Sequence, residues 1–176
     1  MNLEKMFEMQ AELDRRIIRE KGLEGQDLLP GLILALQVEL AECANEWRGF
    51  KFWSNDQQPR EEKLLEEYVD CLHFILSIGN LTKYIKNNDV NDLKRNTLEA
   101  SGVSAFLELF KEITFFNEVR KEYSLISIDP AHIMIYERIF WRFNELGKAL
   151  GFTPEQIEQA YMEKNAVNHK RQQEGY

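Results

Sequence analysis

Four acidic residues could hold a metal ion because of their types and their spacing: Glu39 with Glu42, and Glu67 with Asp70. Each pair is spaced i, i+3, which puts both of its carboxylates on one helix face. Most neighbours are Leu, Val, Ile, Ala or Cys, so two buried helices are expected to carry these groups into a bundle. Carboxylates are rarely buried unless they are paired or bind a metal. Four oxygen ligands without a matching Cys and His cluster favour Mg²⁺ or Mn²⁺.

The elements that must position these residues read as helices. Apolar residues recur at helical spacing, between turn and capping signals, in six segments: about 3–19, 27–48, 59–84, from 96, 129–150, and from 153 to the tail. No apolar run alternates with period two. The sequence therefore predicts an all-α bundle of about six helices with a four-helix core, as a single domain over residues 1–176.

The second segment has a distinctive composition. Residues 29–44 are apolar on nearly all sides, which is typical of a central helix. Glu46 continues the face of Glu39 and Glu42 by one more turn, so it is a candidate fifth carboxylate.

Composition excludes several classes of protein. The formal net charge is -8 for 176 residues, which disfavours a nonspecific nucleic-acid binder. No apolar run approaches the roughly 20 residues of a membrane span, and the first residues lack a signal pattern. We therefore expect a cytoplasmic protein with no membrane contact. Cys43 and Cys71 are too few for a disulfide framework and are expected to be reduced core thiols. They lack the paired loop spacing of a zinc site with His73.

A polar stripe runs along the last helix. Tyr161, Lys164, Asn168 and Arg171 step by three, four and three residues, so they stack on one face. Alone, such a stripe is typical of a solvated surface, and Gln10 and Asp14 of the first helix also look like surface polar residues. Beside a metal cluster, however, the stripe would serve as a phosphate clamp.

Two aromatic features suggest further contacts. The loop GFKFWSNDQQP carries Phe50, Phe52 and Trp53, which would form either a lid over the core or a stacking platform for a flat ligand. The fourth and fifth helices are rich in phenylalanine and carry more apolar surface than one short bundle hides. A homodimer that covers the excess is therefore expected.

The motifs EWRGFKFWSND, EEYVDCLHF and YMEKNAVNHKRQQEGY, together with the ExxE and ExxD spacing, carry a resemblance. The chain resembles the all-α nucleoside triphosphate pyrophosphohydrolases, the superfamily of MazG and the dimeric dUTPases. It looks specifically like the dimeric dUTPase branch over nearly its whole length.

This resemblance implies roles for individual residues. Glu39, Glu42, Glu67 and Asp70 would ligate two or more Mg²⁺ ions, with Mn²⁺ as a substitute. As a separate hypothesis of mechanism, Glu42, beside Glu39, would orient or deprotonate the attacking water, because its neighbours would be occupied as ligands. The remaining implied residues would contact the substrate. Gln10 and Trp53 would line a uracil pocket, with Asp14 where Asn is expected; Lys164, Asn168, Arg171 and Tyr176 would bind or close over phosphates.

The expected activity is hydrolysis of dUTP, and of dUDP, to dUMP with release of pyrophosphate or phosphate. It would limit uracil in DNA and supply dUMP for dTMP synthesis. One alternative is a MazG-like pyrophosphohydrolase for another nucleotide, such as dCTP or a damaged base. Another is a non-catalytic helical binding or regulatory module, which would show no Mg²⁺-dependent turnover.

Overall fold

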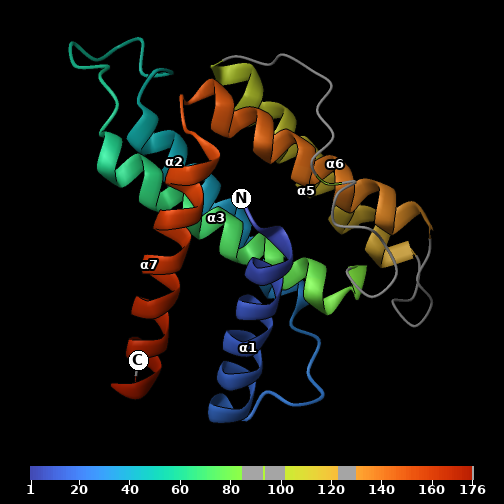
Figure 1. The fold of residues 1–176 in the computed structure, drawn as a ribbon. Coiled ribbons are helices and arrows are strands. Elements are labelled where there is room, and N and C mark those ends of the chain that lie inside the picture. The colour runs from blue at the N-terminus through green and yellow to red at the C-terminus, as the bar shows by residue number, and fades with distance from the viewer. Residues whose placement is uncertain (85–92, 94–101, 123–129, 176) are drawn as a thin grey trace.

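The structure is a computed structural model that describes residues 1–84, 93, 102–122 and 130–175. Its six helices over those ranges are α1 (Leu3–Lys21), α2 (Leu29–Trp47), α3 (Glu61–Leu81), α5 (Val103–Glu122), α6 (Pro130–Ala149) and α7 (Pro154–Gln173) (Figure 1). These ranges hold no strand, which confirms the predicted all-α fold. None of the helices described is long and apolar enough to cross a membrane.

Helix α3, rather than α2, is the central helix. It packs against α1, α2, α6 and α7, whereas α2 packs mainly against α3 and α5. Figure 1 shows α5 and α6 side by side on one side of the α2–α3 pair, and α1 and α7 extending from the other. The outer face of α2 leaves Leu34 and Val38 62% and 46% exposed. The prediction of a central α2 was therefore wrong, because no described helix covers this apolar face.

Local signals set several helix ends. Gly22 ends α1 in the left-handed conformation, with φ of 63°, which glycine adopts without a steric penalty. Thr153 and Gln156 form the predicted capping box at the start of α7. The predicted starts at Asn96 and Asp129 lie outside the described residues.

Two close approaches fix α6 against α3. The Tyr136 ring packs against Gly79 of α3, and the Tyr68 ring packs against Gly147 of α6, where a Cβ atom would clash. Each hydroxyl also donates to a backbone oxygen of the opposite helix at 3.0 Å, Tyr136 to Ile75 and Tyr68 to Phe143. The register of α6 on α3 is thereby fixed, and α3 holds its acidic face toward α2 and α7.

Candidate metal and nucleotide site

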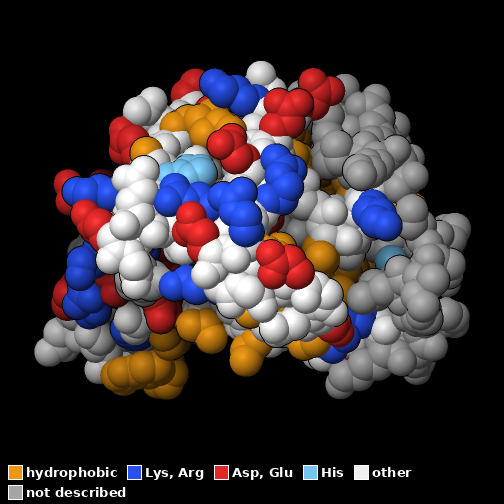
Figure 2. Space-filling view, turned by 90° about the horizontal axis from the view of Figure 1, so that it is seen from below, with side chains coloured by type: hydrophobic (Ala, Val, Ile, Leu, Met, Phe, Trp, Pro, Cys, Tyr) orange, Lys and Arg blue, Asp and Glu red, His pale blue; other side chains and the backbone are white. Residues whose placement is uncertain are grey.

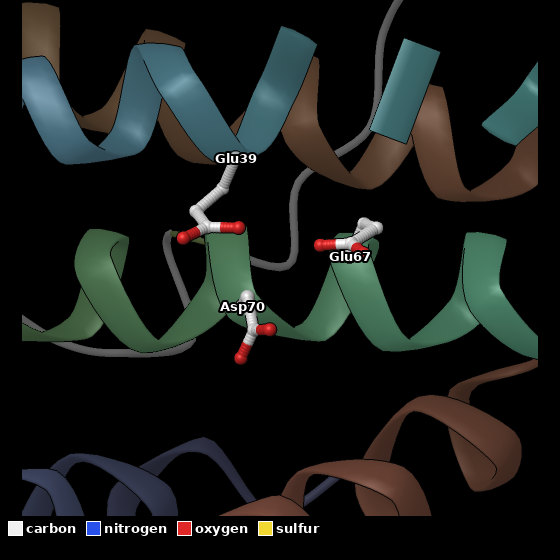
Figure 3. A group of neighbouring side chains, drawn as sticks. All are labelled: Glu39, Glu67 and Asp70. Atoms are coloured by element: carbon white, nitrogen blue, oxygen red, sulfur yellow. The ribbon is translucent and has the colours of Figure 1, made fainter. Parts of the chain in front are cut away.

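Helices α2 and α3 bring three of the four predicted carboxylates together. Glu39 projects from α2 toward α3, where Glu67 and Asp70 lie on successive turns (Figure 3). One oxygen from each residue lies within 4.8 Å of the other two. All three side chains are half-buried, so the group is partly shielded from water yet reachable by a ligand. We call Glu39, Glu67 and Asp70 the acidic cluster.

The two other acidic residues of α2 lie differently. Glu42 is exposed, and its charge raises the pKa of both Glu39 and Glu67, so it borders the acidic cluster on the solvent side. Glu46 is buried, and both of its oxygens accept from Arg60 Nη1 at 3.1 Å. Glu46 therefore serves as an ion-pair partner between the end of α2 and the start of α3, and the suggestion of a fifth metal carboxylate was wrong.

The acidic cluster is electrostatically unfavourable without a counter-charge. Burial, and then the charges of Asp70, Glu42 and Glu67, raise the pKa of Glu39 to about 7. The pKa values of Glu67 and Asp70 are raised as well, in both cases mainly by burial. Carboxylates that crowd together are stabilised when a proton or a cation neutralises part of their negative charge. The oxygen-only donor set and the partial burial fit a hard divalent cation.

The raised pKa of Glu39 predicts a pH-dependent stability. A carboxyl whose pKa rises from 4.5 to about 7 on folding adds stability that is fully present below the unfolded value and lost as pH rises through the folded value. In buffer with EDTA, the melting temperature of the wild type should fall by a few degrees between pH 5 and pH 8. The fall should be smaller in Glu39→Gln, as measured by circular dichroism.

Asp14 provides the internal reference for that experiment. Burial raises its pKa to about 6, so it titrates in the same window in both proteins, and only the difference between them reports Glu39. An identical fall in wild type and variant would contradict the electrostatic coupling.

The polar stripe of α7 lies along the acidic cluster. Lys164 Nζ donates to Asp70 Oδ2 at 2.6 Å and to Glu66 Oε1 at 2.8 Å. The charge of Arg171 lowers the pKa of Glu66, so it lies near the same edge, and Asn168 is half-buried between these two cations. Figure 2 shows lysine and arginine side chains gathered on the face where α1 and α7 end. Tyr176 lies outside the described residues.

Gln10 is a core residue rather than a surface one, being 3% exposed. Its Nε2 donates to Asp14 Oδ1 at 2.9 Å and to Ser77 Oγ at 3.0 Å, and the Ser77 hydroxyl donates to Asp14 Oδ1 at 2.8 Å. The interpretation of Gln10 and Asp14 as surface polar residues was therefore wrong. The two side chains join α1 to α3 one to two turns beyond the acidic cluster.

Two aromatic rings complete this network. The Gln10 oxygen accepts from His73 Nδ1 at 2.7 Å. The Tyr161 hydroxyl lies 3.1 Å from the same oxygen and 3.0 Å from the Met6 backbone oxygen, so the two acceptors share its one hydrogen. The His73 and Tyr161 rings stack with centroids 4.4 Å apart. Helices α1, α3 and α7 thus meet in one polar network beside the acidic cluster.

The comparison with known families agrees with this arrangement. A family model described as dUTPase matches residues 2–176. The chain belongs to this dUTPase family. It is therefore a dUTP diphosphatase of the all-α type, as the resemblance implied. The dUTPases are generally metal-dependent, and the acidic cluster is the candidate site for that ion. A search of curated proteins found no match.

The aromatic loop of this dUTPase does not lie over the core. Phe52 is 85% and Trp53 65% exposed, and Trp53 meets Phe50 and Phe52 edge to face. The loop joins the start of α3, whereas the Gln10 network lies on α3 beyond Asp70. The structure therefore does not bring Trp53 and Gln10 together. Of the two alternatives for the aromatic loop, the prediction of a lid over the core was wrong for Trp53 and Phe52.

The cysteines of the dUTPase chain are buried, as predicted. Cys43 and Cys71 form no disulfide, and burial raises the pKa of the Cys71 thiol. His73 bonds to Gln10 instead. Among the residues that the structure describes, the one candidate metal group contains neither Cys nor His.

Sequence reasoning missed Ser77 as part of this region. The spacing of Asp70, His73 and Ser77 by three and four residues puts them on one α3 face, and that spacing is visible in the sequence. A single serine in an apolar helix is too common a feature to be selected by pattern alone.

Proposed function

We propose that this enzyme hydrolyses dUTP to dUMP and pyrophosphate with two or more Mg²⁺ ions held by Glu39, Glu42, Glu67 and Asp70. The observation that supports this proposal most is the approach of three carboxylates from α2 and α3 to within 4.8 Å of one another. Bound there, Mg²⁺ or Mn²⁺ would neutralise phosphate oxygens and lower the pKa of an attacking water.

Glu42 is our candidate for the group that orients or deprotonates the water. It borders the acidic cluster but is exposed and lies outside the three-oxygen group. The Glu42 carboxylate would therefore coordinate a cation less fully than that of Glu39. It could accept a proton from a water on the solvent side of the acidic cluster.

The stripe of α7 is proposed to bind the phosphates. Lys164 already lies 2.6 Å from Asp70, so a phosphate oxygen at the acidic cluster would be within its reach. Arg171 offers a planar fork of donors and Asn168 a neutral amide. We assign Tyr176 to closure over the phosphates. Catalysis of phosphoryl transfer would then come mostly from positioning the phosphates and neutralising their charge.

Selection of uracil is assigned to Gln10 and Asp14 beside the acidic cluster. Trp53, which this structure does not place next to them, is assigned as a stacking platform for the base. Polar mismatches at a base edge discriminate strongly, so cytosine would be rejected more firmly than a base with one extra methyl. Acceptance of dUDP would follow if contacts to the γ-phosphate are dispensable.

A panel of nucleotides tests the proposal. Release of dUMP from dUTP and dUDP, but little product from dCTP or dTTP, should depend on added Mg²⁺ and stop with EDTA. Preferential turnover of dCTP would contradict the assignment of dUTP as the substrate and favour dCTP instead. Absence of any Mg²⁺-dependent turnover would contradict an enzymatic role for the acidic cluster.

We also propose that two copies of this single domain, residues 1–176, form a homodimer. Helices α2 and α5 are joined by the Gln37 amide, which donates to Thr114 Oγ1 at 3.3 Å. The same two helices carry four exposed apolar side chains, which we call the α2–α5 patch: Leu34, Val38, Leu107 and Phe115. A patch built from two helices is typical of an interface.

Replacing Leu34 with glutamate should disrupt this dimer. The side chain is 62% exposed in the single chain, so a charge there costs the fold little but would be desolvated between two copies. Sedimentation should give twice 20.8 kDa for the wild type and 20.8 kDa for Leu34→Glu. Val167→Glu, an exposed position on α7, is the control and should remain dimeric. A monomeric wild type would rule the dimer out.

A further inference from the structure

Both N–H donors of the Gln10 amide are used within the protein, because its nitrogen donates to Asp14 and Ser77. Its oxygen accepts from His73. The Tyr161 hydroxyl lies 3.1 Å from the same oxygen and 3.0 Å from the Met6 backbone oxygen, and its single hydrogen serves one of the two at a time. Gln10 can donate to a nucleotide only by giving up a partner within the protein.

The same network fixes the tautomer of His73. Asp14 Oδ1 accepts from both Gln10 and Ser77, so a flipped Gln10 amide would turn its oxygen toward a carboxylate. The Gln10 oxygen therefore faces His73, and because that oxygen only accepts, His73 Nδ1 carries the hydrogen. Burial, and to a smaller extent Lys164, lower the pKa of His73 to about 3. The ring stays neutral at physiological pH, with an acceptor lone pair on Nε2.

This acceptor has no partner within the described part of the chain. His73 is 5% exposed and its Nε2 makes no hydrogen bond there, although buried acceptors are nearly always paired. His73 follows Asp70 by one turn on the same α3 face. Lys164, which bonds to Asp70 at 2.6 Å, is near enough to affect the His73 ring. The unpaired nitrogen thus belongs to the region next to the acidic cluster.

We propose that His73 Nε2 accepts a hydrogen bond from the nucleoside part of the substrate, and that Gln10, in addition to its proposed contact with the base, orients His73 with the support of Asp14 and Ser77. This inference rests on the proposed function, because phosphates held near Asp70 would direct the sugar and base along α3. The rise from Asp70 to His73 is about 5 Å, which the nucleoside can span. Deoxyuridine triphosphate has two such donors, the sugar 3′-hydroxyl and the N3–H of uracil.

The two donors have different consequences for selectivity. If N3–H is the donor, cytosine is rejected, because its N3 carries a lone pair that would face the fixed lone pair of His73. If the 3′-hydroxyl is the donor, selection acts on the sugar and leaves the base to other groups. In both cases the substrate supplies the hydrogen-bond donor that His73 Nε2 lacks within the described part of the protein.

The test compares His73→Asn with wild type on three nucleotides. Asparagine places an N–H donor where Nδ1 lies, which preserves the bond to Gln10, but it has no acceptor at the position of Nε2. We would measure kcat/KM for dUTP and 2′,3′-dideoxy-UTP, and measure dCTP as a substrate or as a competitive inhibitor. Ratios between nucleotides do not depend on the folded fraction, so partial misfolding of the variant does not obscure the result.

The expected loss for dUTP is about five- to a hundredfold. With a contact to the 3′-hydroxyl, 2′,3′-dideoxy-UTP should show almost no further loss in the variant. With a contact to N3–H, it should lose as much as dUTP, whereas dCTP should lose nothing. An equal effect on all three nucleotides would show a purely structural His73 and overturn the inference.

A control separates this inference from the proposed function. His169→Asn makes the same replacement on α7, outside the Gln10 network, and should change all three nucleotides by one common factor. If the wild type itself fails to hydrolyse dUTP, the proposed function fails. If it hydrolyses dUTP but His73→Asn is unselective, only the inference fails.

Discussion

Replacing Glu39 with glutamine is expected to lower kcat for dUTP by more than about a hundredfold, since loss of even an outer-shell partner of a metal site costs about ten- to a hundredfold. Glu39 is the only α2 residue in the three-oxygen acidic cluster. Glutamine keeps the shape of the side chain but removes the negative charge and one oxygen. Helical circular dichroism should therefore persist while Mg²⁺-dependent turnover is lost.

Glu62→Gln is the matched control for this variant. Glu62 lies exposed in the first turn of α3, on the same chain segment as the cluster but outside it. Its substitution should leave turnover near the wild-type rate. Unchanged activity in Glu39→Gln, measured at saturating Mg²⁺, would remove the metal-cluster assignment.

Replacing Lys164 with methionine is expected to reduce kcat/KM for dUTP by about ten- to a hundredfold, the range that follows from losing one charge-assisted hydrogen bond. Methionine retains most of the apolar stem, and the ammonium that reaches Asp70 and Glu66 is lost. The loss should appear mainly in KM, because Lys164 is proposed to bind phosphates rather than to move a proton.

Lys170→Met controls for loss of charge on the same helix. Lys170 is exposed and pairs with Glu174 at 3.7 Å, away from the acidic cluster. Its substitution should change KM by less than about twofold, as expected for a surface ion pair. Equal effects of the two substitutions would indicate general electrostatic attraction and no specific phosphate contact.

The acidic cluster was predictable because its signal is local. The i, i+3 spacing fixes which residues share a helix face, and apolar neighbours fix which face is turned inward. Glu39, Glu67 and Asp70 follow from that pattern. The capping box at Thr153 is also local, since it depends on two residues three positions apart.

The environment of Gln10 was not predictable in the same way. Its partners Ser77 and Tyr161 are 67 and 151 residues away in sequence, and only the packing of α1 and α7 on α3 brings them together. Likewise, Glu46 fits the periodicity of a metal ligand, but Arg60, the residue just before α3, donates to both of its oxygens. Spacing along one helix does not show which neighbour arrives from another.

The position of α2 shows a related limit. Its run of apolar residues is equally compatible with a central helix and with a helix that has one face at an interface between two chains. Leu34 and Val38 are exposed in the single chain, so the structure excludes the first alternative. The homodimer proposed above accounts for the second.

The central claim is that the carboxylates of α2 and α3 bind divalent cations, which in turn bind the triphosphate. Its most direct test is an anomalous difference map from crystals grown with Mn²⁺ and a non-hydrolysable dUTP analogue. We expect a peak within bonding distance of oxygens of Glu39, Glu67 and Asp70, with phosphate oxygens on its other side. Absence of a peak between these residues, with their carboxylates turned away from one another, would contradict the claim.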